Sequence, residues 1–388
     1  MIRMLYLMVF QPALIFFVFF VGVFFNKKIR RGVLLRLKFQ FPEGSKNSNP
    51  IWVHCSSGEF EYAKPVLREL KKRDPNCKIL VTFFSPTYVE NIEQCCDVDF
   101  TCPLPWDVPG PLKTFIRHFR PQALLVARTD LWPECLYQCQ RAKVPRVVFS
   151  STKSEITTAD YILTSFYKHP MQLLNKVYCV SDEDKQNLSK IVKLEKIEVI
   201  GDTRFDQAFF RLEHPKPFHK ELFKNKTTPR LILGSSWEED EIALIPQLSD
   251  YVQRGRLSLI IAPHEPSKKH LLQLAELLER YKLKYQFYSE TQDWLEHSEN
   301  EGNHVLLIDK VGILAELYTQ ADLAFVGGSF KGSVHSVMEP LAAGCVVLVG
   351  PHHKNNREAI EFSNLTLPDL SMHVVQPLTS GDGINKYL

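Results

Sequence analysis

From residue 51 onward, short apolar runs alternate with longer amphipathic stretches. In the stretches 59–73 and 112–119, apolar residues recur at the spacing of a helix. The apolar runs are rich in Val, Ile and Leu, as buried parallel strands are. We predict strands at 51–54, 78–84, 123–127, 146–149, 177–180 and 198–200. This alternation is typical of a Rossmann-like α/β domain, in which helices cover both faces of a parallel sheet.

The pattern breaks at residues 209–229, where prolines lie among lysines and other polar residues. A second series of apolar runs follows at 231–234, 257–262, 285–288, 305–308, 323–326 and 346–349. A length of 388 residues also favours two domains. We therefore predict doubly wound domains at 27–208 and 230–388, joined by a linker at 209–229. Ligands are expected in a cleft lined by the carboxyl ends of the strands.

Residues 4–25 carry no charge and consist largely of Leu, Ile, Val, Met and Phe. As a helix, this segment is long enough to span the hydrocarbon core of a bilayer. Four cations follow it directly: Lys27, Lys28, Arg30 and Arg31. Because cations beside a membrane span favour the cytoplasmic side, we predict that the body of the protein lies there. No small-residue cleavage site follows, unlike in a cleaved signal peptide. We predict an uncleaved membrane anchor at 1–26; the alternative is a helix lying at the membrane surface or buried in the protein.

Composition narrows the function classes. A hydrophobic content of 45% and a charged content of 23% are ordinary for globular domains, and a net charge of +3 is too small to indicate a nucleic-acid partner. The nine cysteines are scattered without the spacing of a zinc site. Cys179 and Cys345 lie in apolar runs and are interpreted as core residues. We expect neither a metal nor a cofactor.

The predicted helix at 59–73 carries Lys64, Arg68, Lys71 and Lys72, which helical spacing places in one basic stripe. Such a stripe near a membrane anchor is suited to anionic lipid headgroups. A solvated helix face is the alternative interpretation.

The segment 326–351 combines a strand, a glycine-rich turn, a helix and a second strand. Gly328 and its neighbouring glycines let bare backbone approach a ligand, and a helix start directs N–H groups at an anion. Glu339, in the predicted helix, is placed to accept hydrogen bonds from ribose hydroxyls. The segment predicts a nucleotide or anion pocket; a solvated glutamate beside a tight turn is the alternative.

Polar residues follow other strands at the expected ligand-binding edge. Gly58 and Glu59 follow the first strand, where a carboxylate can act as general base on an alcohol. A glutamate favoured by the dipole of the first helical turn is the alternative. The further candidates after strands are Ser85, Thr87, Asp130, Ser235, His264 and Gly312.

Eight sequence motifs occur in order between residues 51 and 356: WVHCSSGE, SPT, TDLWP, IAPHEP, DKVGILAELY, ADLAFVGGS, HSVMEP and GPHHKN. Together they resemble the 3-deoxy-D-manno-octulosonic acid (Kdo) transferases, which add Kdo from CMP-Kdo to the lipid A precursor of Gram-negative bacteria. The resemblance implies a GT-B fold and an inverting, metal-independent glycosyl transfer at the cytoplasmic face of the inner membrane. It also implies that the first domain binds the acceptor and the second the nucleotide-sugar donor.

The resemblance assigns roles to matching positions. Glu59 corresponds to the base that deprotonates the acceptor hydroxyl, Gly312 to the loop that reads the nucleotide, and Glu339 to the glutamate that holds the CMP ribose. Asp130 matches an acid of the family motif and is expected to assist catalysis. The residues expected to bind substrates are Gly58, Ser85, Thr87, Ser235, His264, Gly312, Gly328, Ser329, His335, Ser336 and Glu339.

This chain departs from the family pattern mainly in the donor half. An arginine that the family usually carries is absent from 263–265, and 333–336 lacks two glycines and an asparagine. Two alternatives follow: a relative that uses another nucleotide sugar on a lipid-linked acceptor, and a non-catalytic relative that binds nucleotide or lipid.

Overall fold

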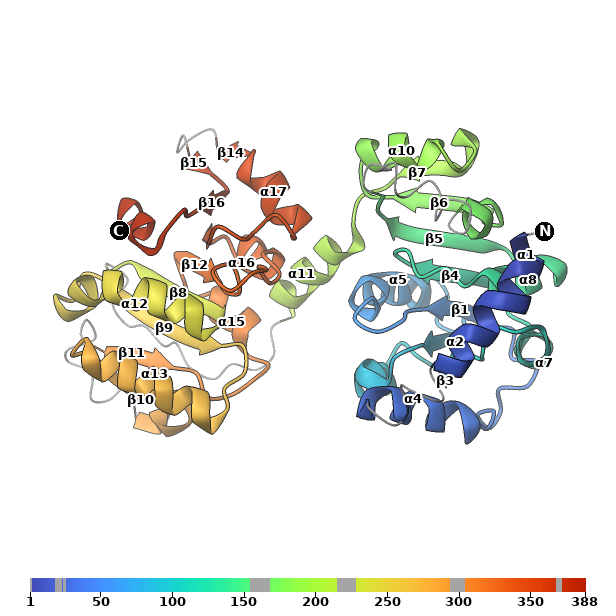
Figure 1. Ribbon diagram of the computed structural model, residues 1–388, viewed down its shortest axis with the longest axis horizontal. Coiled ribbons are helices and arrows are strands. Elements are labelled where there is room, and N and C mark those ends of the chain that lie inside the picture. The colour runs from blue at the N-terminus through green and yellow to red at the C-terminus, as the bar shows by residue number, and fades with distance from the viewer. Residues whose placement is uncertain are drawn as a thin grey trace. The chain divides into compact units, whose positions relative to one another are not determined.

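The computed structural model describes residues 2–17, 23, 26–153, 168–214, 228–293, 304–367 and 372–388. The chain divides into two compact units, Met1–Gln207 and Ala208–Leu388 (Figure 1). The division falls within helix α11 (Thr203–Glu213), which runs across the start of the expected linker. Residues 215–227 of that linker lie outside the described part of the chain.

The first unit is built on a seven-stranded parallel sheet in the order β3-β2-β1-β4-β5-β6-β7. Its strands are β1 Ile51–His54, β2 Ile79–Phe83, β3 Phe100–Pro103, β4 Ala123–Ala127, β5 Arg146–Ser151, β6 Lys176–Cys179 and β7 Ile197–Val199. The predicted strands all form. The sequence missed β3, a short edge strand with only two buried residues. Because strand order reverses between β1 and β4, the carboxyl ends of these two strands mark the point where open α/β sheets bind ligands.

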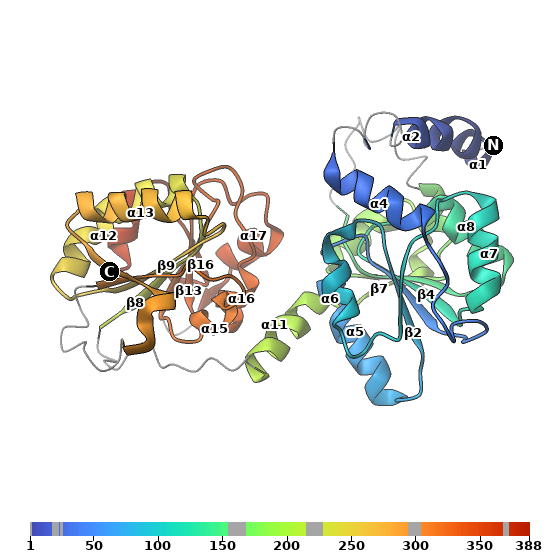
Figure 2. The ribbon, with the colours of Figure 1, turned by 90° about the horizontal axis from the view of Figure 1, so that it is seen from below.

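Helices cover both faces of this sheet (Figure 2). They are α4 Lys27–Leu37, α5 Phe60–Arg73, η3 Pro86–Tyr88, α6 Val89–Glu93, α7 Pro109–Phe119, α8 Pro133–Arg141, α10 Asp182–Ser189 and η4 Leu194–Lys196. Successive residues of β1 point to opposite faces. Trp52 packs with α7 around Phe115, whereas Val53 packs with α5 around Phe60 and Leu67. Both faces of the sheet are therefore buried.

The N-terminal residues form a helical segment of α1 Ile2–Leu5, the π-helical turn η1 Tyr6–Phe10 and α2 Gln11–Phe17. Polar side chains fasten it to the first unit: Arg3 donates to Glu134 at 2.8 and 2.9 Å, and Tyr6 donates to Asp107 at 2.6 Å. Within the described residues, no helix is long and apolar enough to cross a membrane. Residues 1, 18–22 and 24–25 of the predicted anchor lie outside those residues.

The second unit repeats the architecture, with a parallel sheet in the order β10-β11-β9-β8-β12-β13-β16. Its strands are β8 Arg230–Ser236, β9 Ser258–Pro263, β10 Lys284–Phe287, β11 His304–Leu307, β12 Leu323–Val326, β13 Val346–Val349 and β16 Val375–Pro377. Its helices are α12 Glu238–Gln253, α13 Lys268–Arg280, η5 Tyr288–Asp293, α15 Leu314–Tyr318, α16 Met338–Ala342, α17 Arg357–Ser363 and η7 Gly381–Lys386. A small antiparallel pair joins β14 Thr366–Leu367 to β15 Met372–His373. Here the strand order reverses between β8 and β12.

Two glycines allow close packing at this second reversal. A Cβ at Gly327 would lie 2.1 Å from the backbone oxygen of Ser235, and one at Gly234 would lie 1.9 Å from the hydroxyl of Tyr318. The first glycine of the glycine-rich turn is therefore required by contact between adjacent strand ends, independently of any ligand.

We predict that Gly327→Ala lowers the free energy of unfolding of the second unit by about 2 kcal/mol, because the added methyl meets rigid backbone and forces a shift. Gly332→Ala is the matched control in the same turn, since nothing lies within 4 Å of its Cβ position. Urea unfolding followed by circular dichroism measures both. Equal midpoints for the two variants would contradict the prediction.

Candidate functional site

The carboxyl ends of β1 and β4 place Asp130 at the centre of a hydrogen-bonded cluster. Its Oδ2 atom lies 3.0 Å from Nε2 of His54 and accepts a hydrogen bond of 3.2 Å from the Trp132 indole N–H. The Ser56 hydroxyl donates to the same oxygen. His54 ends β1, and Asp130 lies in the loop after β4. Three side chains, from the end of β1, the loop after it and the loop after β4, therefore fix the orientation of this carboxylate.

A chain of hydrogen bonds continues from His54 into the sheet. The Trp52 indole, which can only donate, bonds Thr82 Oγ1 at 2.8 Å, and the same oxygen lies 2.9 Å from His54 Nδ1. The same nitrogen lies 3.2 Å from the Thr82 backbone oxygen, so the imidazole is held between Thr82 and Asp130.

Glu59 lies on the same edge, at the N-cap of α5. Its carboxylate accepts the backbone N–H of Ser57 at 2.8 Å and is half-buried. Burial raises the pKa of the Cys55 thiol, and the charges of Glu59 and Asp130 raise it further. Both predicted catalytic carboxylates therefore lie near this buried residue, and a thiol with a raised pKa is a poor nucleophile.

Two arginines lie against Tyr62 of α5, the helix that begins after Glu59. Arg128 and Arg204 stack on the ring of Tyr62 at 4.8 and 5.2 Å, and Arg204 also donates to the Tyr62 hydroxyl at 3.2 Å. The sequence did not single out Tyr62 or Arg204. Arg204 lies in α11, about 140 residues after Tyr62, so no local pattern joins the two. The edge therefore offers both a base and cations for an anionic group.

The serine–proline–threonine turn borders the same edge. The Ser85 N–H donates to the backbone oxygen of Ser56 at 2.8 Å, and the hydroxyls of Ser85 and Thr87 lie 3.0 Å apart. A Cβ on Gly58 would lie 3.7 Å from the ring of Tyr88, which follows this turn. Fold and sequence agree in bringing Gly58, Glu59, Ser85 and Thr87 to one place.

The predicted basic stripe is used within the protein. Lys64 donates to Glu61 at 2.7 Å, Arg68 donates to Gln207 at 2.8 Å, and Lys71 donates to Asp99 at 2.6 Å. These contacts pair three of the four predicted cations with other residues of the protein, and a contact of the stripe with lipid headgroups stays a prediction. The cations of α4 that precede it are exposed, and they are Lys27, Lys28, Arg30 and Arg31.

In the second unit, Asp240 binds the glycine-rich turn. Its carboxylate accepts the N–H groups of Gly328 at 2.6 Å, Phe330 at 2.9 Å and Trp237 at 2.9 Å, while burial raises its pKa. The Gly328 N–H, expected to face a ligand anion, is thus paired with an acid of the chain itself. Ser329 is also internal: it is fully buried, donates to Val326 and accepts from Gly350. Both residues hold the turn in shape.

Aromatic side chains stack beside this turn. The rings of His264 and His335 lie 4.2 Å apart, and Trp237 lies 4.9 Å from His264. The Trp237 indole donates to His335 Nε2 at 2.9 Å, and the Lys331 ammonium lies 3.3 Å from the Trp237 ring centre. Burial, together with the nearby His264 and Lys331, lowers the pKa of His335 to about 4. The three rings form a stacked aromatic platform with one cation beside it, and no sequence pattern pointed to Trp237 or Lys331.

The other donor-side residues lie around this platform or at separate strand ends. Glu339 in α16 is bonded by Arg211, and the Ser336 hydroxyl accepts the Met338 N–H at 3.4 Å. Ser235 and Gly312 have positive φ angles of 53° and 87°, at the end of β8 and in the loop after β11. Glycine suits the Gly312 position, because other side chains are strained there.

Comparison with known proteins gives a consistent result. The family described as 3-deoxy-D-manno-octulosonic-acid transferase (kdotransferase) matches residues 34–207. The 3-deoxy-D-manno-octulosonic acid transferase of Haemophilus influenzae is 27% identical over 90% of this chain and 81% of its own. That of Aquifex aeolicus is 28% identical over 82% of each chain.

Solved structures agree on the fold. The UDP-GlcNAc 2-epimerase of Neisseria meningitidis superposes with a TM-score of 0.59 at 14% identity, over 87% of this chain and 88% of its own. A glycosyltransferase from Rickettsia africae gives a TM-score of 0.52 at 12% identity, over 87% of each chain. The two α/β units therefore have the arrangement of secondary structure found in GT-B proteins.

The lowered pKa of His335 predicts a pH dependence of stability. Because the folded protein resists protonating this ring, unfolding binds a proton between pH 6.5 and about 4, and stability falls as the pH is lowered through that range. His335→Gln removes the titrating group and keeps an acceptor for the Trp237 indole. Urea midpoints between pH 4 and 7 are expected to fall less steeply in the variant. Parallel curves for the two proteins would show that His335 contributes nothing to the pH dependence.

Proposed function

The chain is a divergent member of the Kdo transferase family, and from that premise we propose that it transfers Kdo from CMP-Kdo to a lipid A precursor. The observation that carries the proposal is the pair of carboxylates, Glu59 and Asp130, at the strand reversal of the first sheet. A glycosyl transfer needs a base for the acceptor hydroxyl and positive groups for anionic substrate. The first unit supplies both at one edge.

In the proposed inverting reaction, the acceptor hydroxyl attacks the anomeric carbon of Kdo as the bond to the phosphate of CMP breaks. Glu59 takes the hydroxyl proton, and the electron pair of the broken bond leaves with CMP. Asp130, fixed by His54, Ser56 and Trp132, orients the acceptor through a hydrogen bond. Arg128 and Arg204 hold anionic groups of the acceptor beside the acids. The reaction requires no metal ion.

The second unit binds the donor in this proposal. The platform of Trp237, His264 and His335 offers a face for the base or sugar, and Lys331 offers charge to the phosphate. Glu339 accepts the ribose hydroxyls, with Arg211 holding its carboxylate in place. Lys331 thereby takes the part of the arginine that is missing from the loop at 263–265. The residues after the second-unit strands, among them Ser235 and Gly312, line the same donor region.

We also propose that the protein acts at the cytoplasmic face of the inner membrane, anchored by its N-terminal segment. Support comes from the uncharged run at 4–25, the exposed side chains of Met8 and Phe16, and the exposed cations of α4. The cations attract anionic headgroups, while the apolar side chains favour lipid.

A different nucleotide sugar is the second candidate donor. It is favoured by the binding of Asp240 to the Gly328 N–H and by the divergent residues at 333–336. Thermal shift measurements with cytidine and uridine nucleotides distinguish the two donors, because a ligand that binds the folded state raises its stability.

We predict that Glu59→Gln lowers kcat for Kdo transfer by roughly 10²–10⁴-fold, because the amide cannot take up the acceptor proton. The amide oxygen still accepts the Ser57 N–H, so stability and donor affinity are expected to stay unchanged. Release of CMP from CMP-Kdo in the presence of a lipid A precursor measures the rate.

Glu61→Gln is the matched control on the same helix, since Glu61 pairs with Lys64 and has no part in the proposed reaction. Its transfer rate is expected to lie within about twofold of wild type, since helical ion pairs of this spacing contribute only about 0.2–0.5 kcal/mol. Equal turnover by wild type and Glu59→Gln would remove Glu59 from its role as base.

A further inference from the structure

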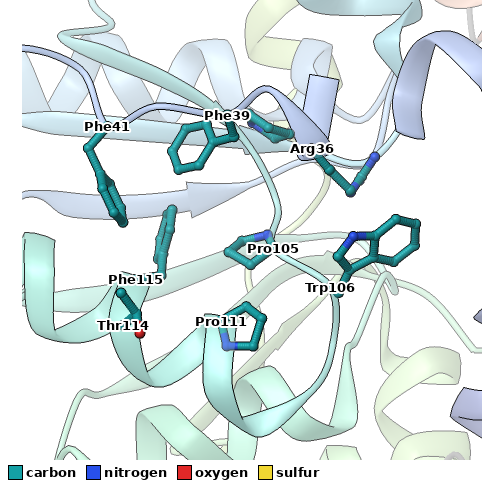
Figure 3. Close-up of a pocket in the computed structure, with 9 residues that line it drawn as sticks. Arg36, Phe39, Phe41, Pro105, Trp106, Pro111, Thr114 and Phe115 are labelled. Atoms are coloured by element: carbon teal, nitrogen blue, oxygen red, sulfur yellow. The ribbon is translucent and has the colours of Figure 1, made fainter. Parts of the chain in front are cut away.

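An apolar pocket lies in the first unit, between the segment that follows α4, the loop after β3, and α7. Figure 3 shows aromatic and proline side chains directed into it from these three elements, including Phe39, Phe41, Trp106, Pro111 and Phe115. Its volume of about 420 Å³ is within the range of small-ligand pockets. Seven of its nine lining residues are phenylalanine, tryptophan or proline, so its walls suit a hydrocarbon.

The polar lining residues are Arg36 and Thr114, and Arg36 is hydrogen-bonded within the wall of the pocket. Its guanidinium donates to the backbone oxygens of Leu104 at 2.9 Å, Gly32 at 3.0 Å and Phe84 at 3.0 Å. It also lies against the rings of Phe84 and Trp106. The pocket offers few groups to a polar ligand, because the Arg36 guanidinium is already hydrogen-bonded to backbone oxygens.

The pocket is joined to the catalytic edge by direct contacts. The Arg36 guanidinium lies 4.6 Å from the Phe84 ring, Phe84 stacks on Trp132 at 4.7 Å, and Trp132 donates to Asp130 at 3.2 Å. Pro103, at the end of β3, lines the pocket, and β3 lies two strands from β1. Two strand spacings amount to roughly 10 Å, which one glycolipid molecule can span.

The surface next to the pocket points to a lipid as the source of the hydrocarbon. Helix α4 ends two residues before Phe39, carries exposed cations along its first turns, and exposes Leu34 and Leu37. Cations beside exposed leucines are the combination found at lipid surfaces. A chain leaving the membrane along α4 would reach the pocket first and Asp130 next.

We propose that this pocket binds one acyl chain of the lipid acceptor and thereby positions its sugar hydroxyl at Glu59. The proposal rests on the proposed function and deepens it, since it makes the acylated part of the acceptor a specificity element. An acyl chain that leaves the membrane gains contacts with the apolar walls of the pocket, so we expect an acylated acceptor to bind more tightly than a deacylated one.

Thr114→Phe tests the pocket, because Thr114 is exposed on α7 and a larger side chain there fills the space without disturbing the core. Lys113→Phe is the matched control: it adds the same bulk at the next exposed position, which does not line the pocket. In the binding arm, a bromine-labelled fatty acid quenches the fluorescence of Trp106, identified by its loss in Trp106→Phe. The full chain in detergent is used throughout.

We expect Thr114→Phe to weaken quenching by roughly tenfold and Lys113→Phe to leave it unchanged. In the transfer arm, Thr114→Phe is expected to raise KM for an acylated acceptor by a similar factor, with kcat unchanged. A chemically deacylated acceptor is expected to show the same KM with all variants. Equal quenching and equal KM for Thr114→Phe and Lys113→Phe would overturn the proposal.

The two arms separate this proposal from the function on which it rests. If no variant transfers Kdo but Thr114→Phe alone loses quenching, the acyl pocket is supported and the proposed function fails. If Thr114→Phe also loses binding to acceptor-free phosphatidylglycerol vesicles, the pocket belongs to bulk membrane lipid and the acceptor assignment is overturned.

Discussion

The site in the first unit depends on one constraint, the parallel register that pairs His54 of β1 with Thr82 of β2. In-register neighbours on parallel strands point to the same face, so the imidazole meets the threonine hydroxyl. The Trp52 indole donates to that hydroxyl, and Asp130 lies against the other ring nitrogen of the imidazole. A slip of one residue would turn His54 to the opposite face and leave Asp130 without its main partner.

In the second unit, a different acid connects the loops at the strand reversal. At its strand reversal, the buried Asp240 gathers three backbone N–H groups and fixes the glycine-rich turn against α12. In each unit, then, a carboxylate joins the two loops where strand order reverses. The difference lies in exposure: the Asp130 carboxylate is 29% exposed and available to substrate, whereas Asp240 is fully buried and structural. This distinction agrees with the proposed role of Asp130 in catalysis and with a structural role for Asp240 in the glycine-rich turn.

Much of the fold was predictable because strands that are buried on both faces consist of continuous apolar runs in the sequence. The strands β3 and β16 were missed because edge strands are short, partly exposed and able to hold proline. Glu59 and Asp130 could be selected because parallel sheets place ligands at the carboxyl ends of their strands. The roles of Thr82 and Asp240 could not be predicted. That of Thr82 depends on the register between β1 and β2, and Asp240 looks in the sequence like any acid in the first turn of a helix. The contact between Arg211 and Glu339 joins residues too distant in sequence for any local pattern to reveal.

In the proposed function, the first-unit edge is a transfer site that deprotonates a lipid-linked acceptor. The most direct measurement is the rate at which the wild-type chain releases CMP from CMP-Kdo, with and without a lipid A precursor, together with the mass of the lipid product. We expect release that depends on the acceptor and a product heavier by one or more Kdo units. Release that is independent of the acceptor, or an unmodified lipid after prolonged incubation, would contradict the proposed function.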